Sequence, residues 1–562
     1  MRRSCSTLAA FGASFIAACA GESGSGAPRT SGGLLDASVE RGIAFSIRRG
    51  GDDHFMPDSM GPGCALFDAD GDGDLDAFFV QGLRGADGGL ASDAGRDRLL
   101  LQGADGRFRD ASGESGLDDP RYGMGVAVAD VDSDGDLDVF VTNFGSSRLY
   151  LNRGDGTFLD FTEASGIVEE GWASSAGFCD YDADGRPDLF VARYLEFDLT
   201  IRGAGGGGAP DFPSPLQFKG LPGRLWHNEG GGLFRDVSAE SGIASVAGRG
   251  LGLGFLDLND DGRQDIFVAN DSEPNFAWIQ TEPGRFEEQA FPLGLAVNRV
   301  GRPQANMGVA IGDVEGDGTA EIFVTHLVSE TNVLYRRQSA RKYADMTAGS
   351  GLGASSLDKT GFGTAFADLE NDGDLDLLVV NGRILRRGPR GVAPIDAHWL
   401  PYAEENQLYL NSGSGKFELA SGEQGGDWSQ ALAVGRAVAV GDVDQDGGLD
   451  ALVSNGDGSC RLYVNQIDRR GNYIRVRALD SEGRCDLLGA RVEVSAGDQR
   501  WSRTIETCVG YLSAQGPSAH FGLGASASID SIVVNWPGGG AEKFPGGPVN
   551  CEVRLRKGSG TH

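Results

Sequence analysis

The sequence is poor in basic residues: 49 Lys and Arg stand against 81 Asp and Glu, which leaves a net charge of −32 over 562 residues. Nucleic-acid binding requires Lys and Arg to neutralise phosphates, so we expect no nucleic-acid partner. The sequence also lacks a Gly-x-Ser-x-Gly elbow, a His-Glu-x-x-His motif and a phosphate-binding loop, and its six His residues are scattered. The common signatures of hydrolases, metalloproteases and nucleotide-binding enzymes are therefore missing.

Long hydrophobic runs are also lacking. The apolar stretch at residues 8–18 follows Arg2 and Arg3 and is too short to span a bilayer comfortably. It ends in Ile16-Ala-Ala-Cys19, which resembles a bacterial lipobox. We therefore predict a lipoprotein-type signal peptide at residues 1–18, with lipidation at Cys19. The alternative is an ordinary secretory signal cleaved near residue 18 or 20.

The segment after the apolar stretch, residues 19–33, is rich in Gly and Ser and predicts a flexible tether. With the lipobox, it indicates an exported protein that is an outer-membrane or cell-surface lipoprotein, or otherwise periplasmic or secreted. Membrane contact is expected only through a lipid anchor at Cys19.

Cysteine is scarce, with eight residues in the chain, and there is no Cys-x-x-Cys-His site for covalent haem. An exported chain meets oxidising conditions, so disulfides are compatible with its compartment. The spacing does not fix the pairing; Cys485 with Cys508 is favoured because both lie near the carboxyl end. Cys64 and Cys179 lie on expected strands and read as core residues.

An acidic pattern of nine residues is abundant. Its first copy is Asp68-Ala-Asp-Gly-Asp-Gly-Asp-Leu-Asp76, with carboxylates at positions 1, 3, 5 and 9 and Gly73 at position 6. Ca²⁺ binds oxygen ligands at about 2.3–2.6 Å, and alternate residues around a tight turn can supply them. Position 7 would offer its backbone carbonyl. A strand-like run follows, so the loop is expected to join two strands.

The pattern occurs seven times. A single copy could be a solvated turn, but seven copies in one register favour up to seven Ca²⁺ sites. The candidate metal residues are Asp68, Asp70, Asp72, Asp74 and Asp76; Asp130, Asp132, Asp134, Asp136 and Asp138; Asp180, Asp182, Asp184, Arg186 and Asp188; Asp257, Asn259, Asp261, Arg263 and Asp265; Asp313, Glu315, Asp317, Thr319 and Glu321; Asp368, Glu370, Asp372, Asp374 and Asp376; and Asp442, Asp444, Asp446, Gly448 and Asp450.

Each loop lies in a longer repeat. A Gly-rich strand precedes it, a buried strand follows it, and an alternating strand and a short closing segment complete the unit. Four short strands in a repeat of this length are typical of a propeller blade. The last repeat lacks its closing segment, which residues 34–47 match. We therefore predict an all-β, seven-bladed propeller over residues 34–468, with residues 34–47 completing the last blade.

Two further segments depart from the repeat. Residues 383–406 are basic and aromatic and form an insertion, read either as a recognition loop or as a loop that packs on the propeller. Residues 471–557 alternate polar and apolar side chains without the acidic pattern. They predict a small C-terminal β domain.

These motifs resemble a known family. The acidic loops resemble the FG-GAP (VCBS) repeats of integrin α-chain propellers. The tail resembles the ASPIC/UnbV domain through Leu488-Gly-Ala-Arg-Val492, Gly510-Tyr-Leu-Ser513, His520-Phe-Gly-Leu-Gly524 and Val534-Asn-Trp-Pro-Gly538. The combination is similar to the cartilage acidic protein family and its bacterial relatives. The resemblance implies a secreted, Ca²⁺-binding, seven-bladed propeller and no particular activity. The Asn and Glu substitutions at Asn259, Glu315 and Glu321 predict weaker sites there.

The clustered acidic residues belong to a loop that recurs, whereas a catalytic carboxylate pair should occur once. We therefore expect a Ca²⁺-stabilised, exported binding or adhesion module, with an unknown protein or glycan partner, rather than an enzyme. A surface enzyme that acts on polysaccharide, and a lipid-anchored component of an outer-membrane assembly, are the alternatives.

Overall fold

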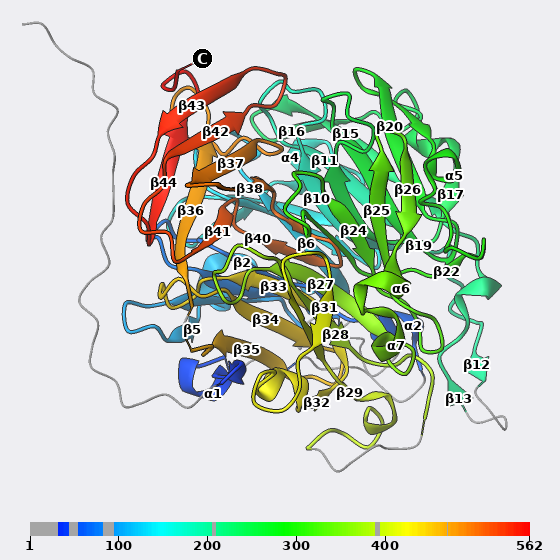
Figure 1. Cartoon of the computed structure of the whole chain (residues 1–562). Coiled ribbons are helices and arrows are strands. Elements are labelled where there is room, and N and C mark those ends of the chain that lie inside the picture. The colour runs from blue at the N-terminus through cyan, green and yellow to red at the C-terminus, as the bar shows by residue number, and fades with distance from the viewer. Residues whose placement is uncertain are drawn as a thin grey trace, which may run out of the picture.

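The computed structural model describes residues 32–43, 46, 54–82, 95–204, 210–387, 394–468 and 470–561 (Figure 1). The predicted signal peptide and Cys19 lie outside these residues. No helix within the described ranges is long and apolar enough to cross a membrane.

Seven antiparallel sheets each carry one acidic loop, which joins the first strand of the sheet to the second. We number these repeat sheets by the order of their loops. Repeat sheets one to four contain, respectively, β2 (Cys64–Phe67), β3 (Asp76–Phe79), β4 (Arg98–Gln102) and β5 (Phe108–Asp110); β6 (Gly123–Ala129), β7 (Asp138–Asn143), β8 (Arg148–Asn152) and β9 (Phe158–Asp160); β10 (Ala173–Cys179), β11 (Asp188–Arg193), β15 (Arg224–Gly230) and β16 (Leu233–Asp236); and β18 (Gly250–Leu256), β19 (Asp265–Glu273), β20 (Phe276–Glu282) and β21 (Arg285–Glu288).

The remaining repeat sheets follow the same plan. They contain β23 (Val309–Gly312), β24 (Glu321–Val324), β25 (Val333–Ser339) and β26 (Lys342–Asp345); β27 (Gly361–Ala367), β28 (Asp376–Asn381), β30 (Gln407–Asn411) and β31 (Phe417–Leu419); and β33 (Gly435–Gly441), β34 (Asp450–Asn455), β35 (Cys460–Asn465) and β1 (Leu34–Asp36).

Short elements connect the repeat sheets. They are α1 (Ser38–Arg41), α2 (Met56–Met60), α3 (Ser112–Ser115), α4 (Thr162–Ser165), α5 (Ala290–Leu293), α6 (Thr347–Ser350) and α7 (Gly353–Ser356), the 3-10 turns η2 (Pro215–Gln217), η3 (Ile243–Ser245), η4 (Leu400–Tyr402) and η5 (Asp427–Ser429), and the strands β12 (Gly203–Ala204), β13 (Pro210–Asp211), β14 (Leu221–Pro222), β17 (Ala247–Gly248), β22 (Gln304–Ala305), β29 (Glu404–Glu405) and β32 (Leu432–Ala433).

The first strands of the repeat sheets lie side by side around a common axis. β2 neighbours β6, β6 neighbours β10, and the series continues through β18, β23 and β27 to β33, which returns to β2. The sheets twist away from this axis (Figure 1). The predicted all-β, propeller-like fold is confirmed.

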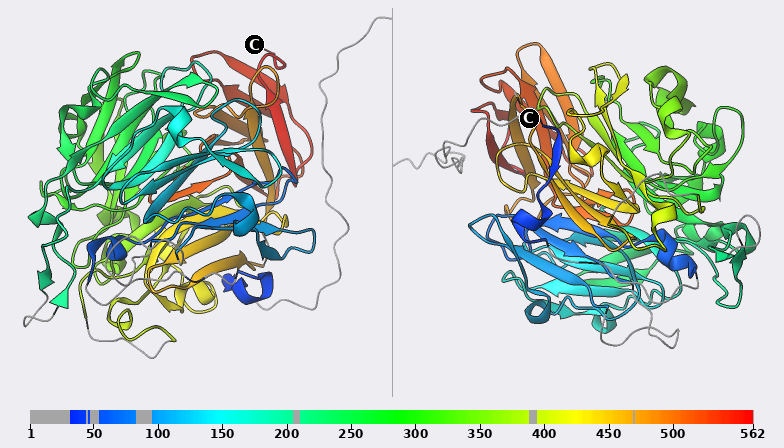
Figure 2. Two further views of the ribbon diagram at one scale, coloured as in Figure 1. Left: turned by 180° about the vertical axis from the view of Figure 1, so that it is seen from behind. Right: turned by 90° about the horizontal axis from the view of Figure 1, so that it is seen from below.

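The amino-terminal strand completes repeat sheet seven. β1 pairs antiparallel with β35, and Leu34 lies opposite Asn465. Figure 2 shows this blue strand beside the yellow and orange strands, although it lies at the other end of the chain. The closing role predicted for this segment is confirmed for residues 34–36.

The C-terminal region forms two further sheets. One contains β36 (Asn472–Leu479), β41 (Ala519–Gly524) and β44 (Cys551–Arg556), and the other contains β37 (Arg491–Ala496), β38 (Gln499–Thr504), β42 (Ser531–Asn535) and β43 (Ala541–Pro545). Their apolar faces share a core that includes Val476, Val494, Phe521 and Val534.

A hairpin of the C-terminal region fills the axis of the repeat sheets. It consists of β39 (Cys508–Val509), Gly510–Leu512 and β40 (Ser513–Gln515), and β40 pairs parallel with β2 of repeat sheet one. The Leu512 carbonyl accepts from Val126 and the Gly510 carbonyl accepts from Leu253, on sheets two and four. Small residues on and next to the first strands make this possible: a Cβ added to Gly63, which precedes β2, would lie 1.9 Å from the Leu512 oxygen.

Two expectations are settled by the packing. The pairing of Cys485 with Cys508 is wrong, because all six described cysteines are free thiols. Cys485 lies beside Asp130 of the second loop, whereas Cys508 lies on the axial hairpin, 3.9 Å from the Leu253 oxygen. Cys64 and Cys179 are buried in the core, as predicted.

The basic and aromatic insertion packs on the repeat sheets. Arg383 is buried and its Nε lies 2.6 Å from Glu404 Oε1. The Tyr402 hydroxyl donates to Asp211 of β13 at 2.8 Å, which joins the insertion to the segment between β11 and β15 of repeat sheet three. Of the two readings, the packing role agrees with the structure.

Candidate metal centres

Each acidic loop is shaped by its own first carboxylate. In the second loop, Asp130 Oδ1 accepts from the Asp134 amide at 3.1 Å and Asp130 Oδ2 accepts from the Gly135 amide at 3.0 Å. Gly135 adopts φ +108°, which favours glycine. The same pair of contacts recurs at Asp180 and Asp313. The turn is therefore closed by side chain to backbone hydrogen bonds within the loop.

The ninth residue of the loop is the most deeply placed. Asp138 is fully buried; its Oδ2 accepts from the Val131 amide at 2.7 Å and its Oδ1 from the Asn152 amide at 2.8 Å. Asp76 and Asp188 make equivalent contacts. These bonds tie each loop to the third strand of its own sheet and fix the direction of the carboxylate.

Four of the seven loops bring three carboxylates together. In each, an oxygen from positions 1, 3 and 9 lies within 4.8 Å of the other two. The groups are Asp68, Asp70 and Asp76; Asp130, Asp132 and Asp138; Asp180, Asp182 and Asp188; and Asp442, Asp444 and Asp450.

Loops four, five and six form no such group among the described residues. In loop four, the Asn259 amide donates to Asp261 at 2.9 Å. In loop five, Glu315 forms an ion pair with Arg336. In loop six, the amide of Gly522 in the C-terminal region donates to Asp368 Oδ2 at 3.0 Å. The weaker affinity expected at loops four and five stays a prediction.

Positions 5 and 7 form the tip of the loop. Asp134 Oδ1 accepts from the Asp136 amide at 3.0 Å, so the position-5 carboxylate holds the backbone of position 7. The same contact recurs in every loop. The Arg186 and Arg263 side chains fold back onto Asp184 and Asp261 as ion pairs. The carbonyl role proposed for position 7 in metal binding stays a prediction.

Without a cation, these carboxylates resist ionisation. Burial raises the pKa of Asp76 and of Asp138 to about 8 and that of Asp180 to about 7, and neighbouring carboxylates add to the shift. In addition, Asp182 Oδ1, Asp442 Oδ1 and Asp444 Oδ1 are buried and accept no hydrogen bond within the described chain. Oxygen atoms of this kind suit a hard divalent cation, so the residues fit Ca²⁺.

Two sets of residues in the site were not identified from the sequence. The first set consists of one Asn, Gln or Arg side chain at the same register of each third strand. This side chain donates a hydrogen bond to a backbone oxygen in the acidic loop of the preceding sheet. Asn152 Nδ2 donates to the Ala69 oxygen at 3.1 Å, and Gln102 Nε2 donates to the Val443 oxygen, which links sheet one to sheet seven. We call this set the inter-sheet clamps: Gln102, Asn152, Asn228, Gln280, Arg337, Asn411 and Asn465. Their distance from the loop varies from 14 residues between Asp138 and Asn152 to 40 between Asp188 and Asn228. The available signal was the recurring strand pattern that contains them, such as Arg148-Leu-Tyr-Leu-Asn152.

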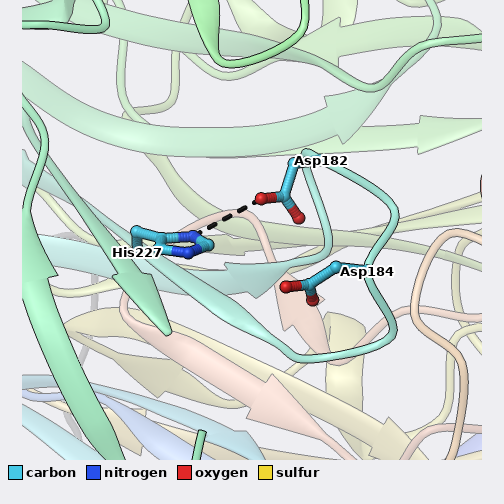
Figure 3. A group of neighbouring side chains, drawn as sticks. All are labelled: Asp182, Asp184 and His227. Carbon is cyan, nitrogen blue, oxygen red and sulfur yellow. Dashed lines mark ion pairs between the residues drawn. The ribbon is translucent and has the colours of Figure 1, made fainter. Parts of the chain in front are cut away.

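The second is His227 on β15, which enters the third loop (Figure 3). Its Nδ1 lies 3.1 Å from Asp188 Oδ1, 3.5 Å from Asp182 Oδ2 and 3.3 Å from the Tyr181 hydroxyl. Asp182, Asp184 and His227 also offer ligand atoms within 4.8 Å of one another. Most repeats carry an aliphatic residue at this position of the third strand. The His at this position in the third repeat was the signal that could have identified it.

The loops face a cavity of about 1200 Å³ between the repeat sheets and the C-terminal sheets. Acidic-loop residues line one side, and Arg475, Arg503, Glu506 and Trp536 of the C-terminal region line the other. Burial raises the pKa of Glu506 to about 8. The cavity therefore combines carboxylates, guanidinium groups and an indole, a surface suited to a polar ligand.

Comparisons with known proteins agree with this architecture. The model of the FG-GAP-like repeat matches residues 68–141, 130–191 and 257–324, and the model named ASPIC and UnbV matches residues 481–562. Cartilage acidic protein 1 of Xenopus tropicalis is 25% identical over 325 residues, which cover 57% of this chain and 38% of that protein. The Homo sapiens protein is 27% identical over 323 residues, covering 54% and 43%. The chain thus spans about half or less of the length of these two relatives.

Among solved structures, a lectin of Agrocybe aegerita that recognises non-reducing terminal N-acetylglucosamine is 15% identical, with a TM-score of 0.37, and the match covers 78% of this chain and 94% of that one. Saccharomyces cerevisiae Sqt1 is 11% identical, with a TM-score of 0.39, covering 75% and 98%. These matches are too distant to inform function. The chain therefore carries FG-GAP-like repeats and a C-terminal segment that matches ASPIC and UnbV, and over about half of its length it is similar to cartilage acidic protein 1.

Proposed function

We propose that the chain is an exported binding module that Ca²⁺ stabilises and that recognises a protein or glycan partner. The observation that carries this proposal is the gathering of carboxylates at positions 1, 3 and 9 in four separate loops. A structural cation explains a constellation that recurs around the fold, because each copy can hold an ion from its own oxygens.

Metal binding is tested by measuring the Ca²⁺ that the full chain retains after equilibrium dialysis. Asp132→Asn in the second loop should lower the retained Ca²⁺ by one equivalent, because it removes one of three gathered carboxylates. Glu370→Gln in the sixth loop is the matched control and should leave the count unchanged. An equal loss in both variants, or no retained Ca²⁺ in the parent chain, would contradict this part of the proposal.

Partner recognition is tested on glycan and protein arrays with and without a chelator. The cavity between the two parts of the molecule supplies the surface, because its Arg, carboxylate and Trp side chains suit a polar ligand. We expect binding that Ca²⁺ restores and that Trp536→Ala weakens. If the chelated protein binds its partner as well as the Ca²⁺-loaded protein does, partner recognition does not depend on the metal sites and this part of the proposal is contradicted.

One observation favours the alternative of a polysaccharide-acting enzyme. Glu506 occurs outside the repeated loops, lines the cavity and has a pKa raised to about 8 by burial, which suits a general acid. If the chain is a hydrolase, turnover on a polysaccharide panel should be lost in Glu506→Gln. Turnover of this kind would replace the non-enzymatic proposal.

Export and lipid anchoring at Cys19 also belong to the proposal. They rest on Ile16-Ala-Ala-Cys19 after a short apolar stretch, which resembles a bacterial lipobox. Several acyl chains on one Cys would give stable anchoring. Cell fractionation should find the parent chain with membranes and Cys19→Ala in the soluble exported fraction. Equal distribution of the two proteins would remove the anchor from the proposal.

A further inference from the structure

We propose that the third acidic loop binds a first-row divalent transition-metal ion in preference to Ca²⁺, and that His227 sets this preference. The inference rests on the proposed metal binding and differs from it in the kind of ion. Two groups of possible ligands share Asp182 in this loop: Asp182 and Asp184 with His227 of β15, and Asp182 with Asp180 and Asp188.

The third loop and His227 offer two kinds of donor atom. Imidazole nitrogen is a ligand for Zn²⁺, Cu²⁺, Fe²⁺ and Ni²⁺, whereas Ca²⁺ and Mg²⁺ take oxygen ligands. His227 is mostly buried, with 14% of its side chain exposed, and its Nδ1 faces the loop carboxylates (Figure 3). The third loop therefore offers nitrogen and oxygen, whereas the other three gathered loops offer carboxylate oxygen.

The spacing suits a small ion. Ligands held about 2.0–2.2 Å from one Zn²⁺ lie about 3–3.5 Å apart. His227 Nδ1 lies 3.1 Å from Asp188 Oδ1 and 3.5 Å from Asp182 Oδ2. The other Asp182 oxygen, Oδ1, is buried and accepts no hydrogen bond from the described residues. An ion bound by both oxygens of Asp182 would satisfy Oδ1 as well as Oδ2.

The other repeats show that the imidazole is specific to the third loop. The same register of the third strand, given by its pairing with the fourth strand, holds Leu101, Leu151, Ile279, Leu410 and Val464 in five sheets. In sheet five it holds Arg336, whose guanidinium pairs with Glu315 at position 3 of the loop. The Arg336 guanidinium has no lone pair to offer a metal ion, whereas an imidazole ring nitrogen is a common metal ligand.

The competing explanation is that His227 is an imidazolium that neutralises the loop, as Arg336 does in sheet five. The two explanations differ in what happens when metal is supplied. An imidazolium competes with any cation, whereas a ligand retains a transition metal in the presence of excess Ca²⁺.

The experiment uses the full chain, stripped with a chelator and dialysed with Zn²⁺ in excess Ca²⁺. We expect one equivalent of Zn²⁺ to remain in the parent chain, and Co²⁺ in its place to give a visible ligand-field absorption band. His227→Leu carries the residue found at this register in sheet two and should lower the Zn²⁺ affinity by at least about 10-fold, since even outer-shell partners cost this much. Leu151→His is the matched gain variant and should retain a second equivalent.

A second variant protects the test from misfolding. His227→Asn keeps a polar group and supplies an amide oxygen, so it should lose Zn²⁺ selectivity while Ca²⁺ binding at the first, second and seventh loops is unchanged. The inference is overturned if Ca²⁺ displaces Zn²⁺ from the parent chain, or if His227→Asn retains Zn²⁺ as tightly as the parent. Ca²⁺ binding at the other loops without Zn²⁺ selectivity would defeat this inference alone, whereas a chain that takes up neither ion would defeat the proposed function as well.

Discussion

At the scale of single residues, the acidic loops store electrostatic repulsion that a proton or a metal ion relieves. The position-9 carboxylates Asp76 and Asp138 are buried and have pKa values raised to about 8. In an unfolded chain their pKa would be about 4. The folded protein without metal therefore binds protons that the unfolded chain has released between these two pH values.

This difference predicts how stability depends on pH. Because the pKa of these carboxyl groups is higher in the folded state than in the unfolded state, their protonation adds to the unfolding free energy. The contribution is full below about pH 4 and is lost as the pH rises toward 8. The chelated protein should therefore lose more than about 1.4 kcal/mol of unfolding free energy between pH 5.5 and 8, the value of one pKa unit at one group. Urea unfolding at the two pH values measures it. With saturating Ca²⁺ the loss should vanish, because the metal replaces the protons; a chelated protein that gains stability over this range would contradict the explanation.

The sequence predicted the loops more fully than it predicted their differences. The spacing of the carboxylates identified the ligand positions, because the nine residues of each loop are neighbours in the sequence and the Gly turn brings alternate ones together. Which loops gather their carboxylates depends on contacts from elsewhere, such as Arg336 on Glu315 and Gly522 on Asp368. Those contacts arise from strand register and domain packing, which no single repeat encodes.

At the scale of elements, the axial hairpin depends on a glycine that no other residue can replace. A Cβ at Gly510 would lie 1.7 Å from the Val309 oxygen, and its φ is +37°. The hairpin could not have been placed from the sequence, because its partners are distributed over first strands that lie hundreds of residues away. The motif Gly510-Tyr-Leu-Ser513 appeared only as a mark of the C-terminal domain.

Gly510→Ala should destabilise the protein through both the clash and the backbone strain. We expect a loss of about 2–4 kcal/mol, since overpacking alone costs about 1–3 kcal/mol and Ala at positive φ adds about 1 kcal/mol. Chemical denaturation in Ca²⁺ measures it. Gly497→Ala is the control, because Gly497 has φ +60° with no atom within 4 Å of the added Cβ; equal losses in the two variants would show that the axis is not tightly filled.

The inter-sheet clamps predict a second element-scale effect. Asn228 is fully buried and its Nδ2 donates to the Val131 oxygen at 2.9 Å and to the Pro187 oxygen at 3.0 Å. Asn228→Ala removes both hydrogen bonds, although the Val131 oxygen still accepts from the Gly232 amide at 3.3 Å, and should cost about 1–3 kcal/mol. The exposed Gln499→Ala should change stability by less than about 0.5 kcal/mol. Similar melting curves for the two variants would argue that the clamps contribute little.

At the scale of the whole molecule, the repeat sheets and the C-terminal domain share one interior. The hairpin lies on the axis, and residues such as Trp501 and Gly522 contact the sixth loop. Calorimetry of the Ca²⁺-loaded chain should therefore show one cooperative transition. Two separated transitions would mean that the hairpin leaves the axis at little cost and that the parts unfold independently.

The strand β1 has a consequence for the order in which the molecule assembles. Ser38, which follows β1, bonds to Leu462, 424 residues later in the chain. During synthesis β1 cannot pair until β33–β35 have been made, because its partner in the fold is β35. A large loop must then close in the last step, which makes this step slow. Until then, β35 presents a bare edge that chaperones or neighbouring copies could capture.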